Sequence, residues 1–337
     1  MTFSPVYYAA ALAAGCAVSS ASLPFWRTWC VRRGVVDDPG HRKIHALPIP
    51  LAGGLAVVTG LLVPILAAAL LLWLQSPASQ GRAGWVDGHT AALLTHGLER
   101  RALELASILA GAIGILIVGI LDDQRELQPA QKFAGQCLVA FLVAAGGARI
   151  TLFVPNVLFS YAVTILWILT LINAFNFMDN MNGLCTGLGV IAAAAFGCIA
   201  AIDGQYLVAS IAFVACGALA GFLPYNYPRA TAFLGDAGSH LTGYLLATLA
   251  ILPHFYTRTR PHPLAVLSPL LILGVPLADL VSVVWIRTRA GRPFYIGDTN
   301  HLSHRLVRSG IPPARAVAWI WLLAALLALL AVRLAAP

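Results

Sequence analysis

The stretch GILIVGILDDQ, residues 114–124, runs eight apolar or glycine residues directly into two adjacent carboxylates, Asp122 and Asp123. A long apolar run is typical of a helix that crosses a bilayer, where a charged side chain is costly unless it is paired or functional. Two acids at the end of such a run put charge where the apolar environment stops. The stretch therefore predicts a membrane helix that ends at a surface and presents two carboxylates there.

The whole chain has the composition of an integral membrane protein. Of its 337 residues, 59% are hydrophobic and 10% are charged, and the mean hydropathy is +0.82, outside the range of soluble domains. Apolar runs of about 20 residues favour membrane helices over barrel strands. We predict an all-α integral membrane protein, one polytopic domain over residues 1–337. Its ten transmembrane helices are expected near 6–25, 51–74, 103–121, 130–147, 158–175, 183–202, 205–223, 237–253, 264–286 and 314–334.

The basic residues predict the orientation of these helices. Two thirds of the 21 lysines and arginines fall in the loops on one side of the ten predicted spans, and basic loops favour the cytoplasmic side. We therefore predict that both termini are extracytoplasmic. The first residues, MTFSPVYYAAALAAG, lack the basic start of a signal peptide, which favours a first membrane helix over a cleaved signal. Six cysteines without a CxxC pair predict neither a disulfide framework nor a structural metal site.

The end of the opening stretch combines acids with a lysine and an amide. Lys132 and Gln136 lie one turn apart at the start of the helix that follows Asp122 and Asp123. Paired carboxylates can bind Mg²⁺, or one can act as a base whose pKa the other raises. The alternative is a pair of solvated acids near a helix C-terminus, which the helix dipole disfavours.

A second helix end carries a polar ridge within NAFNFMDNMNGL, residues 173–184. Asn173, Asn176, Asp179 and Asn182 are spaced by three, so they lie on adjoining parts of a helix surface. Hydrogen bonds between helices would account for one or two of these side chains. Four of them predict a lined cavity.

A third end is NYPRATAFLGDAGSHLTG, residues 226–243, where Asp236 stands between Gly235 and Gly238 just before a helix. The glycines would let a ligand approach the backbone, and the helix start would offer free N–H groups to phosphate. Alternatively, Asp236 is simply the N-cap of that helix.

The fourth segment is a basic loop, GRPFYIGDTNHLSHRLVRSG, residues 291–310. Its His301, His304 and Arg305 can donate hydrogen bonds to diphosphate oxygens, although such a loop can instead hold anionic lipid head groups. Together, the four segments place carboxylates, amides and cations at one membrane surface. This combination predicts a magnesium diphosphate site.

Five motifs along nearly the whole chain resemble, in order, those of the polyprenyl-phosphate N-acetylhexosamine-1-phosphate transferases (glycosyltransferase family 4). They are DDPGHRKIHALPIPLAGG, GILDDQRELQPAQKFAGQ, NAFNFMDNMNGL, NYPRATAFLGDAGS and HLSHRL. The first and the last resemble the branch that uses N-acetylhexosamine donors such as UDP-GlcNAc. The resemblance implies a bacterial inner-membrane enzyme with a cytoplasmic catalytic face.

The resemblance also implies roles for individual residues. Asp236 would bind Mg²⁺, for which Mn²⁺ can substitute, and Phe233 would stack on uracil. Asp122 would act as the base for the lipid phosphate, with Asp123 beside it. The remaining matches, near the diphosphate, the lipid phosphate or the sugar, are Lys132, Gln136, Lys43, His45, Asn173, Asn176, Asp179, Asn226, His301, His304 and Arg305. Asp279 matches a further family position, and a structural pairing with Arg287 two turns on is expected.

The chain departs from the family pattern at three places. The common DGxDGL reads Asp179-Asn180-Met181-Asn182-Gly183-Leu184 here, so Asn182 would ligate the cation as an amide beside Asp179 and Asp236. Ser303 replaces a histidine that is common in the last loop. The proline after Asn226 comes one residue earlier than expected.

The implied reaction transfers an N-acetylhexosamine-1-phosphate from a UDP-sugar to undecaprenyl phosphate and releases UMP. Its partners would be these two substrates and membrane lipids, with no nucleic acid. The family resemblance is compatible with a homodimer, and the sequence itself does not fix the oligomeric state. The sequence does not separate direct attack from a covalent aspartyl-phosphate intermediate. Three alternatives remain open: a flippase for lipid-linked intermediates, an inactive family member, and a CDP-alcohol phosphotransferase, whose DGxxAR signature is absent.

Overall fold

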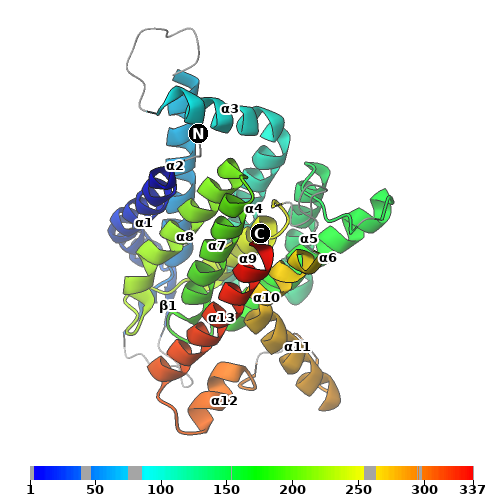
Figure 1. Cartoon of the computed structure of the whole chain (residues 1–337). Coiled ribbons are helices and arrows are strands. Elements are labelled where there is room, and N and C mark those ends of the chain that lie inside the picture. The colour runs from blue at the N-terminus through cyan, green and yellow to red at the C-terminus, as the bar shows by residue number, and fades with distance from the viewer. Residues whose placement is uncertain are drawn as a thin grey trace.

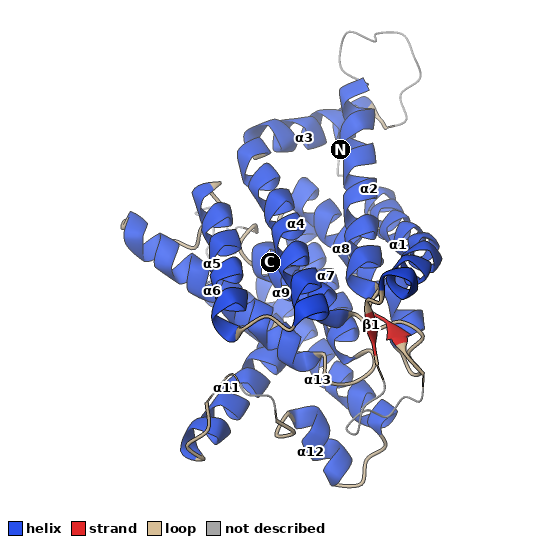
Figure 2. Cartoon of the chain, turned by 180° about the vertical axis from the view of Figure 1, so that it is seen from behind, coloured by secondary structure: helices blue, strands red, loops and turns tan. Residues whose placement is uncertain are grey.

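The chain folds into a bundle of α-helices with one short β-ribbon (Figure 1, Figure 2). The computed structural model describes residues 4–38, 47–74, 86–152, 154–253, 263–293, 295 and 298–336. Its strands are β1 (Val36–Asp37) and β2 (Ile49–Pro50), which pair antiparallel. Its helices are α1 (Pro5–Arg33), α2 (Gly53–Leu74), α3 (Gly88–Arg100), α4 (Ala102–Arg125), α5 (Pro129–Ala145), α6 (Val157–Met178), α7 (Leu184–Ile202), α8 (Tyr206–Asn226), α9 (Gly235–Leu249), the 3₁₀ helix η2 (Pro263–Leu267), α10 (Ser268–Ile272), α11 (Gly274–Arg289), α12 (Leu302–Arg308) and α13 (Pro313–Ala335).

The predicted all-α membrane class is confirmed. Among the described residues, seven helices are long and apolar enough to cross a membrane, or eight if the bent pair of residues 265–272 and 274–289 counts as one span. The number of ten crossings stays a prediction, because α5 and α9, with 17 and 15 residues, are shorter than the candidate helices. The side on which the termini lie also stays a prediction.

The ninth predicted span, residues 264–286, is not one straight helix. It breaks at Leu273 and bends by 64° between α10 and α11. Pro276 explains the break, because it has no N–H to donate to the carbonyl four residues earlier and its ring crowds that carbonyl. Helix α3 was not predicted. It has 13 residues, is capped by the Asp87 side chain, and lies at the opposite end of the bundle from β1 and α12 (Figure 1).

Helix α9 forms the centre of the bundle, and every residue from Ala237 to Leu249 is buried. Helices α2, α4 and α6 all pack against it. Two glycines permit this close approach: a Cβ on Gly54 would lie 2.6 Å from the backbone nitrogen of Gly238, and one on Gly119 would lie 2.3 Å from the Ala237 Cα. Because backbone meets backbone here, the C-terminal end of α4 is held against the first turn of α9.

Candidate active site

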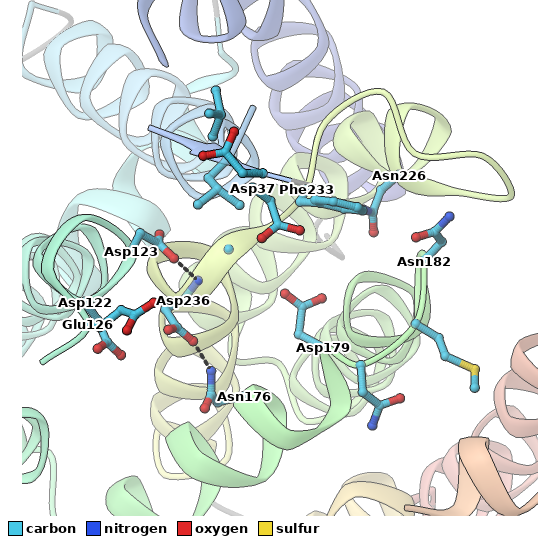
Figure 3. A pocket seen from close by; sticks show the side chains of 16 residues that line it. Asp37, Asp122, Asp123, Glu126, Asn176, Asp179, Asn182, Asn226, Phe233 and Asp236 are labelled. Atoms are coloured by element: carbon cyan, nitrogen blue, oxygen red, sulfur yellow. Dashed lines mark hydrogen bonds between the residues drawn. The ribbon is translucent and has the colours of Figure 1, made fainter. Parts of the chain in front are cut away.

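A cavity of about 560 Å³ lies among the ends of α4, α6 and α8, the starts of α7 and α9, and strand β1 (Figure 3). Three of the four segments singled out in the sequence therefore meet, although they are far apart along the chain. Seven of the chain's acids line the cavity, and no lysine or arginine is among the described lining residues. The lining residues are Val36, Asp37, Asp38, Leu51, Asp122, Asp123, Glu126, Asn176, Asp179, Asn180, Met181, Asn182, Asn226, Phe233, Gly235 and Asp236.

Asp123 caps helix α9 from another helix. Its carboxylate accepts hydrogen bonds from the backbone N–H groups of Asp236, at 2.7 Å, and Ala237, at 3.0 Å. Gly235 makes room for it, with φ +73°, and a Cβ there would lie 2.9 Å from the Asp123 Oδ2. The expectation that these two N–H groups are free to bind phosphate is wrong, and so is the alternative that Asp236 is the N-cap.

Because Asp123 caps the helix, the Asp236 side chain is free to face the cavity. The Asn176 amide donates hydrogen bonds to Asp236 and, at 3.1 Å, to the Ser239 hydroxyl. The Lys132 Nζ lies 3.6 Å from the Asp236 Oδ1, and about a third of the Asp236 side chain, 34%, stays exposed. Figure 3 shows Asp179 and Asp236 on either side of one open space.

Asp122 is almost buried, at 7% exposure, and its two oxygens are already bonded. Its Oδ2 lies 2.5 Å from the Lys132 Nζ. Its Oδ1 accepts the backbone N–H of Leu127 at 3.0 Å and so closes the end of α4. The structure thus brings together Asp122, Lys132 and Asp236, as the sequence predicted. Both oxygens of Asp122 have partners, whereas a general base needs an oxygen that is free to accept a proton.

The carboxylates that face the cavity suit a hard divalent cation such as Mg²⁺, which prefers oxygen ligands. Burial raises the pKa of Asp179 to about 8, and the charges of Asp236 and Asp123 act in the same direction. A bound cation would oppose this shift. Asn182 fits less well, because its Nδ2 donates to the Pro228 carbonyl at 3.2 Å and Figure 3 places it away from Asp236.

Asn226 is buried, and its amide bonds to three groups of the chain. Its Oδ1 accepts from the Gly183 N–H at 2.9 Å and the Thr186 hydroxyl at 3.2 Å, and its Nδ2 donates to the Ala232 carbonyl at 3.1 Å. It thereby ties the end of α8 to the start of α7 and to the loop that leads into α9. This arrangement favours a structural role over direct contact with a ligand.

Asn226→Leu is expected to lower the free energy of unfolding by about 3 kcal/mol, because it leaves buried donors and an acceptor unpaired. Asn226→Asp keeps the two accepted bonds and should lose less. Thermal unfolding of the purified protein in detergent, followed by tryptophan fluorescence, measures both. An Asn226→Leu midpoint equal to that of wild type would show that these hydrogen bonds contribute no stability.

Asn173 and Gln136 meet outside the set of residues that line the cavity. The Asn173 Nδ2 donates to the Gln136 Oε1 and to the Leu169 carbonyl, both at 2.8 Å. The pair joins α6 to α5. Of the predicted polar ridge, Asn176, Asp179 and Asn182 line the cavity, whereas Asn173 bonds between helices.

The predicted basic loop lies at the same end of the bundle as β1 (Figure 1), but His301, His304 and Arg305 are not among the lining residues. The His301 Nδ1 lies 2.7 Å from the Asp279 Oδ2, and the Leu302 N–H donates to the Asp279 Oδ1 at 2.6 Å. The His301 ring also contacts Phe177, with 5.6 Å between centroids. Asp279 therefore ties the start of α12 to α11, and the His301 ring packs against the end of α6.

Among the described residues, Arg287 pairs with Asp298, and not with Asp279 as its spacing of two turns predicted. Its Nε and Nη2 bind the two oxygens of Asp298, at 3.1 and 3.2 Å, and its guanidinium lies 4.9 Å from the centre of the Phe177 ring. Although burial opposes it, hydrogen bonds from Arg287 and Asn300 hold the pKa of Asp298 well below its usual range. Burial, with the charges of His301 and Arg308, lowers the pKa of His304.

Some residues fall outside the sequence predictions or outside the described structure. Lys43 and His45 lie outside the described residues. Asp37, Asp38 and Asn180 line the cavity but were not predicted as site residues, although the first two begin a quoted motif. His240, one turn after Asp236, was also missed; the Asp-x-x-x-His spacing was the available signal.

Comparison with known proteins gives the chain a family. The model of glycosyl transferase family 4 matches residues 105–254. A decaprenyl-phosphate N-acetylglucosaminephosphotransferase of Mycobacterium tuberculosis is 36% identical over 317 residues, which cover 86% of this chain and 73% of that protein. The corresponding protein of Mycolicibacterium smegmatis is 35% identical, over 88% of this chain and 74% of its own length.

A more distant relative is the undecaprenyl-phosphate alpha-N-acetylglucosaminyl 1-phosphate transferase of Escherichia coli (strain K12). It is 27% identical over 318 residues, which cover 90% of this chain and 77% of that protein. The family resemblance drawn from the five motifs is thus confirmed, and it favours a transferase over a flippase or a CDP-alcohol enzyme. The chain belongs to glycosyl transferase family 4.

Proposed function

We propose that the chain transfers an N-acetylhexosamine-1-phosphate from a UDP-sugar to undecaprenyl phosphate and releases UMP. The transferred group that we propose first is N-acetylglucosamine-1-phosphate. The observation that carries the proposal is the cavity at the helix ends, with its acids, amides and Phe233. The names of the relatives, which specify polyprenyl-phosphate acceptors and N-acetylglucosamine phosphate, support the same substrates. The reaction would take place at the cytoplasmic face of a bacterial inner membrane.

The charge of the cavity argues for a cation-dependent reaction. A diphosphate would enter a space lined by seven acids, without a lysine or arginine among the described lining residues. Its negative charges and those of the acids would repel each other strongly in a partly buried site. Asp236 and Asp179 are the residues that would hold Mg²⁺. When bound, Mg²⁺ would neutralise the donor diphosphate and its developing charge.

The bond changes need no proton acceptor on the protein. An oxygen of the lipid phosphate attacks the phosphorus attached to the sugar, and the bond between that phosphorus and the UMP oxygen breaks. Because the acceptor phosphate is already anionic at pH 7, Asp122 need not remove a proton from it. Asp122 instead holds the Lys132 ammonium at 2.5 Å, where it can attract the acceptor phosphate.

The surroundings of Lys132 suit an acceptor that arrives from the bilayer. On the same helix, the side chains of Phe133 and Leu138 are 54% and 70% exposed, which is typical of a surface that contacts lipid chains. A polyprenyl tail can lie along such a surface while its phosphate reaches Lys132. Phe233, held by a hydrogen bond from its N–H to the Pro50 carbonyl at 3.0 Å, would stack on the uracil ring.

The proposal is tested by UMP release from the purified protein in detergent with undecaprenyl phosphate, Mg²⁺ and one of several UDP-N-acetylhexosamines. We expect release that requires both the lipid and Mg²⁺ and that is fastest with UDP-N-acetylglucosamine. Release that depends on the lipid but favours another donor would correct the sugar. No release from any donor would overturn the proposal. If one UMP per enzyme molecule forms when no acceptor lipid is present, the reaction passes through a covalent intermediate.

A further inference from the structure

His240 is a fully buried histidine without an assigned purpose. It lies on α9 one turn after Asp236, its exposed fraction is 0%, and neither ring nitrogen has a hydrogen-bond partner within the described part of the chain. A buried polar group without a partner costs free energy, so each such case calls for a ligand, a water molecule or another explanation. Both nitrogens of the His240 imidazole are buried polar groups of this kind.

Two of the carboxylates already described lie close to the His240 ring. A carboxylate oxygen of Asp122, a carboxylate oxygen of Asp236 and a ring nitrogen of His240 form a triangle. These three atoms all lie within 4.8 Å of one another. Asp236 and His240 are four apart on α9 and share a helix face, whereas Asp122 comes from α4. Ligand atoms around one divalent cation, at bond lengths of about 2.1 Å, lie about 3 to 4 Å apart, so small side-chain rotations would complete the triangle.

Only one corner of the triangle formed by Asp122, Asp236 and His240 lies outside the set of residues that line the cavity. Asp122 and Asp236 line the cavity, whereas His240 does not and is fully buried. Asp236 can therefore face two cation positions. One is in the cavity with Asp179, and the other is between Asp122 and the buried His240.

Lys132 already brings one positive charge to the second position. Its Nζ lies 2.5 Å from the Asp122 Oδ2 and 3.6 Å from the Asp236 Oδ1. A divalent cation and this ammonium would repel each other and share the same carboxylates, so they compete. The long lysine side chain can swing toward the cavity mouth, where an acceptor phosphate would meet it.

We propose that Asp122, Asp236 and His240 form a second cation position that binds a divalent transition metal, with Mn²⁺ as its probe, in competition with the Lys132 ammonium. The imidazole nitrogen favours Mn²⁺, Co²⁺ or Zn²⁺ over Mg²⁺, which prefers oxygen ligands and keeps its waters. Occupation releases Lys132 toward the acceptor. The inference rests on the proposed transferase reaction only for this last step, because metal binding is measured without turnover.

The experiment is Mn²⁺ binding to the purified wild-type protein in detergent, without UDP-sugar or lipid. Electron paramagnetic resonance of free Mn²⁺ gives the affinity, and pulsed measurements detect ¹⁴N coupled to bound Mn²⁺. We expect one coupled nitrogen. Mn²⁺ that binds with oxygen ligands only, or no Mn²⁺ binding at all, would overturn the proposal whether or not the protein releases UMP.

Three variants sharpen the test. His240→Leu should abolish the ¹⁴N coupling and weaken Mn²⁺ binding about tenfold, whereas His96→Leu, which removes an exposed histidine of α3, should change neither. Lys132→Met should tighten Mn²⁺ binding about tenfold, because it removes the competing charge. A ¹⁴N signal that persists in a folded His240→Leu protein, or unchanged Mn²⁺ affinity in Lys132→Met, would contradict the assignment.

Discussion

Asp236→Asn is expected to lower the rate of UMP release about a thousandfold, while the protein keeps its fold. Asparagine has the same shape, and its amide oxygen can still accept the hydrogen bond from the Asn176 amide. The capping of α9 is also untouched, because Asp123 binds the backbone N–H of residue 236 and not its side chain. The substitution therefore removes a negative charge from the cavity and little else.

The matched control for this prediction is Asp87→Asn. Asp87 caps α3 by accepting the Thr90 N–H at 2.9 Å, far from the cavity, and asparagine caps helices about as well as aspartate. The control should retain the full rate. Both variants are compared with wild type for UMP release and for unfolding midpoint. A rate for Asp236→Asn within about tenfold of wild type would mean that the Asp236 charge does not hold the reacting diphosphate or its cation.

The position of the site could be predicted from the sequence because hydropathy is a local property. The apolar run that ends at Asp122 and the amides that end α6 place polar groups at helix ends, whatever the packing of the helices. Their convergence on one cavity follows if those ends share one membrane surface. This much needed only the spacing of apolar and polar residues.

The role of each polar side chain could not be predicted, because it depends on partners far away in the sequence. Asp123 and Asp236 read alike as acids at helix ends, yet one caps the other's helix across 113 residues. Asn226 reads as a binding residue but bonds to the backbone of α7 and of the next loop. Only tertiary contacts distinguish a side chain that supports the site from one that faces it.

The same limit explains the missed elements. Helix α3 has too few apolar residues to read as a span, and its residues are polar enough to read as a loop. The bend at Leu273 depends on how Pro276 and its neighbours pack, and proline is tolerated in some membrane helices. His240 falls within a predicted span. That its ring has no hydrogen-bond partner among the described residues is visible only once α4, α5 and α9 are placed together.

Two alanine substitutions on α4 are expected to differ in their effect on stability. In an exposed or loosely packed helix position, Gly→Ala stabilises by about 1 kcal/mol, because alanine has the higher helix propensity. Gly114 meets this condition, since a Cβ there has only the Val139 Cγ2 nearby, at 3.0 Å, and that side chain can move. Gly119 does not, because its Cβ would lie 2.3 Å from the Ala237 Cα and 2.7 Å from the Asp236 carbonyl oxygen.

Gly119→Ala should therefore lower the free energy of unfolding by about 3 kcal/mol, whereas Gly114→Ala should be neutral or slightly stabilising. No side-chain rotation relieves the contact at residue 119, so α4 must move away from the first turn of α9. That movement separates the Asp123 carboxylate from the N–H groups it caps and shifts Asp236, so the rate of UMP release should fall as well. Unfolding midpoints in detergent measure the first effect, and UMP release measures the second. Equal midpoints for the two variants would mean that the backbones of α4 and α9 do not meet at Gly119, and the geometry on which the carboxylate cluster depends would have to be revised.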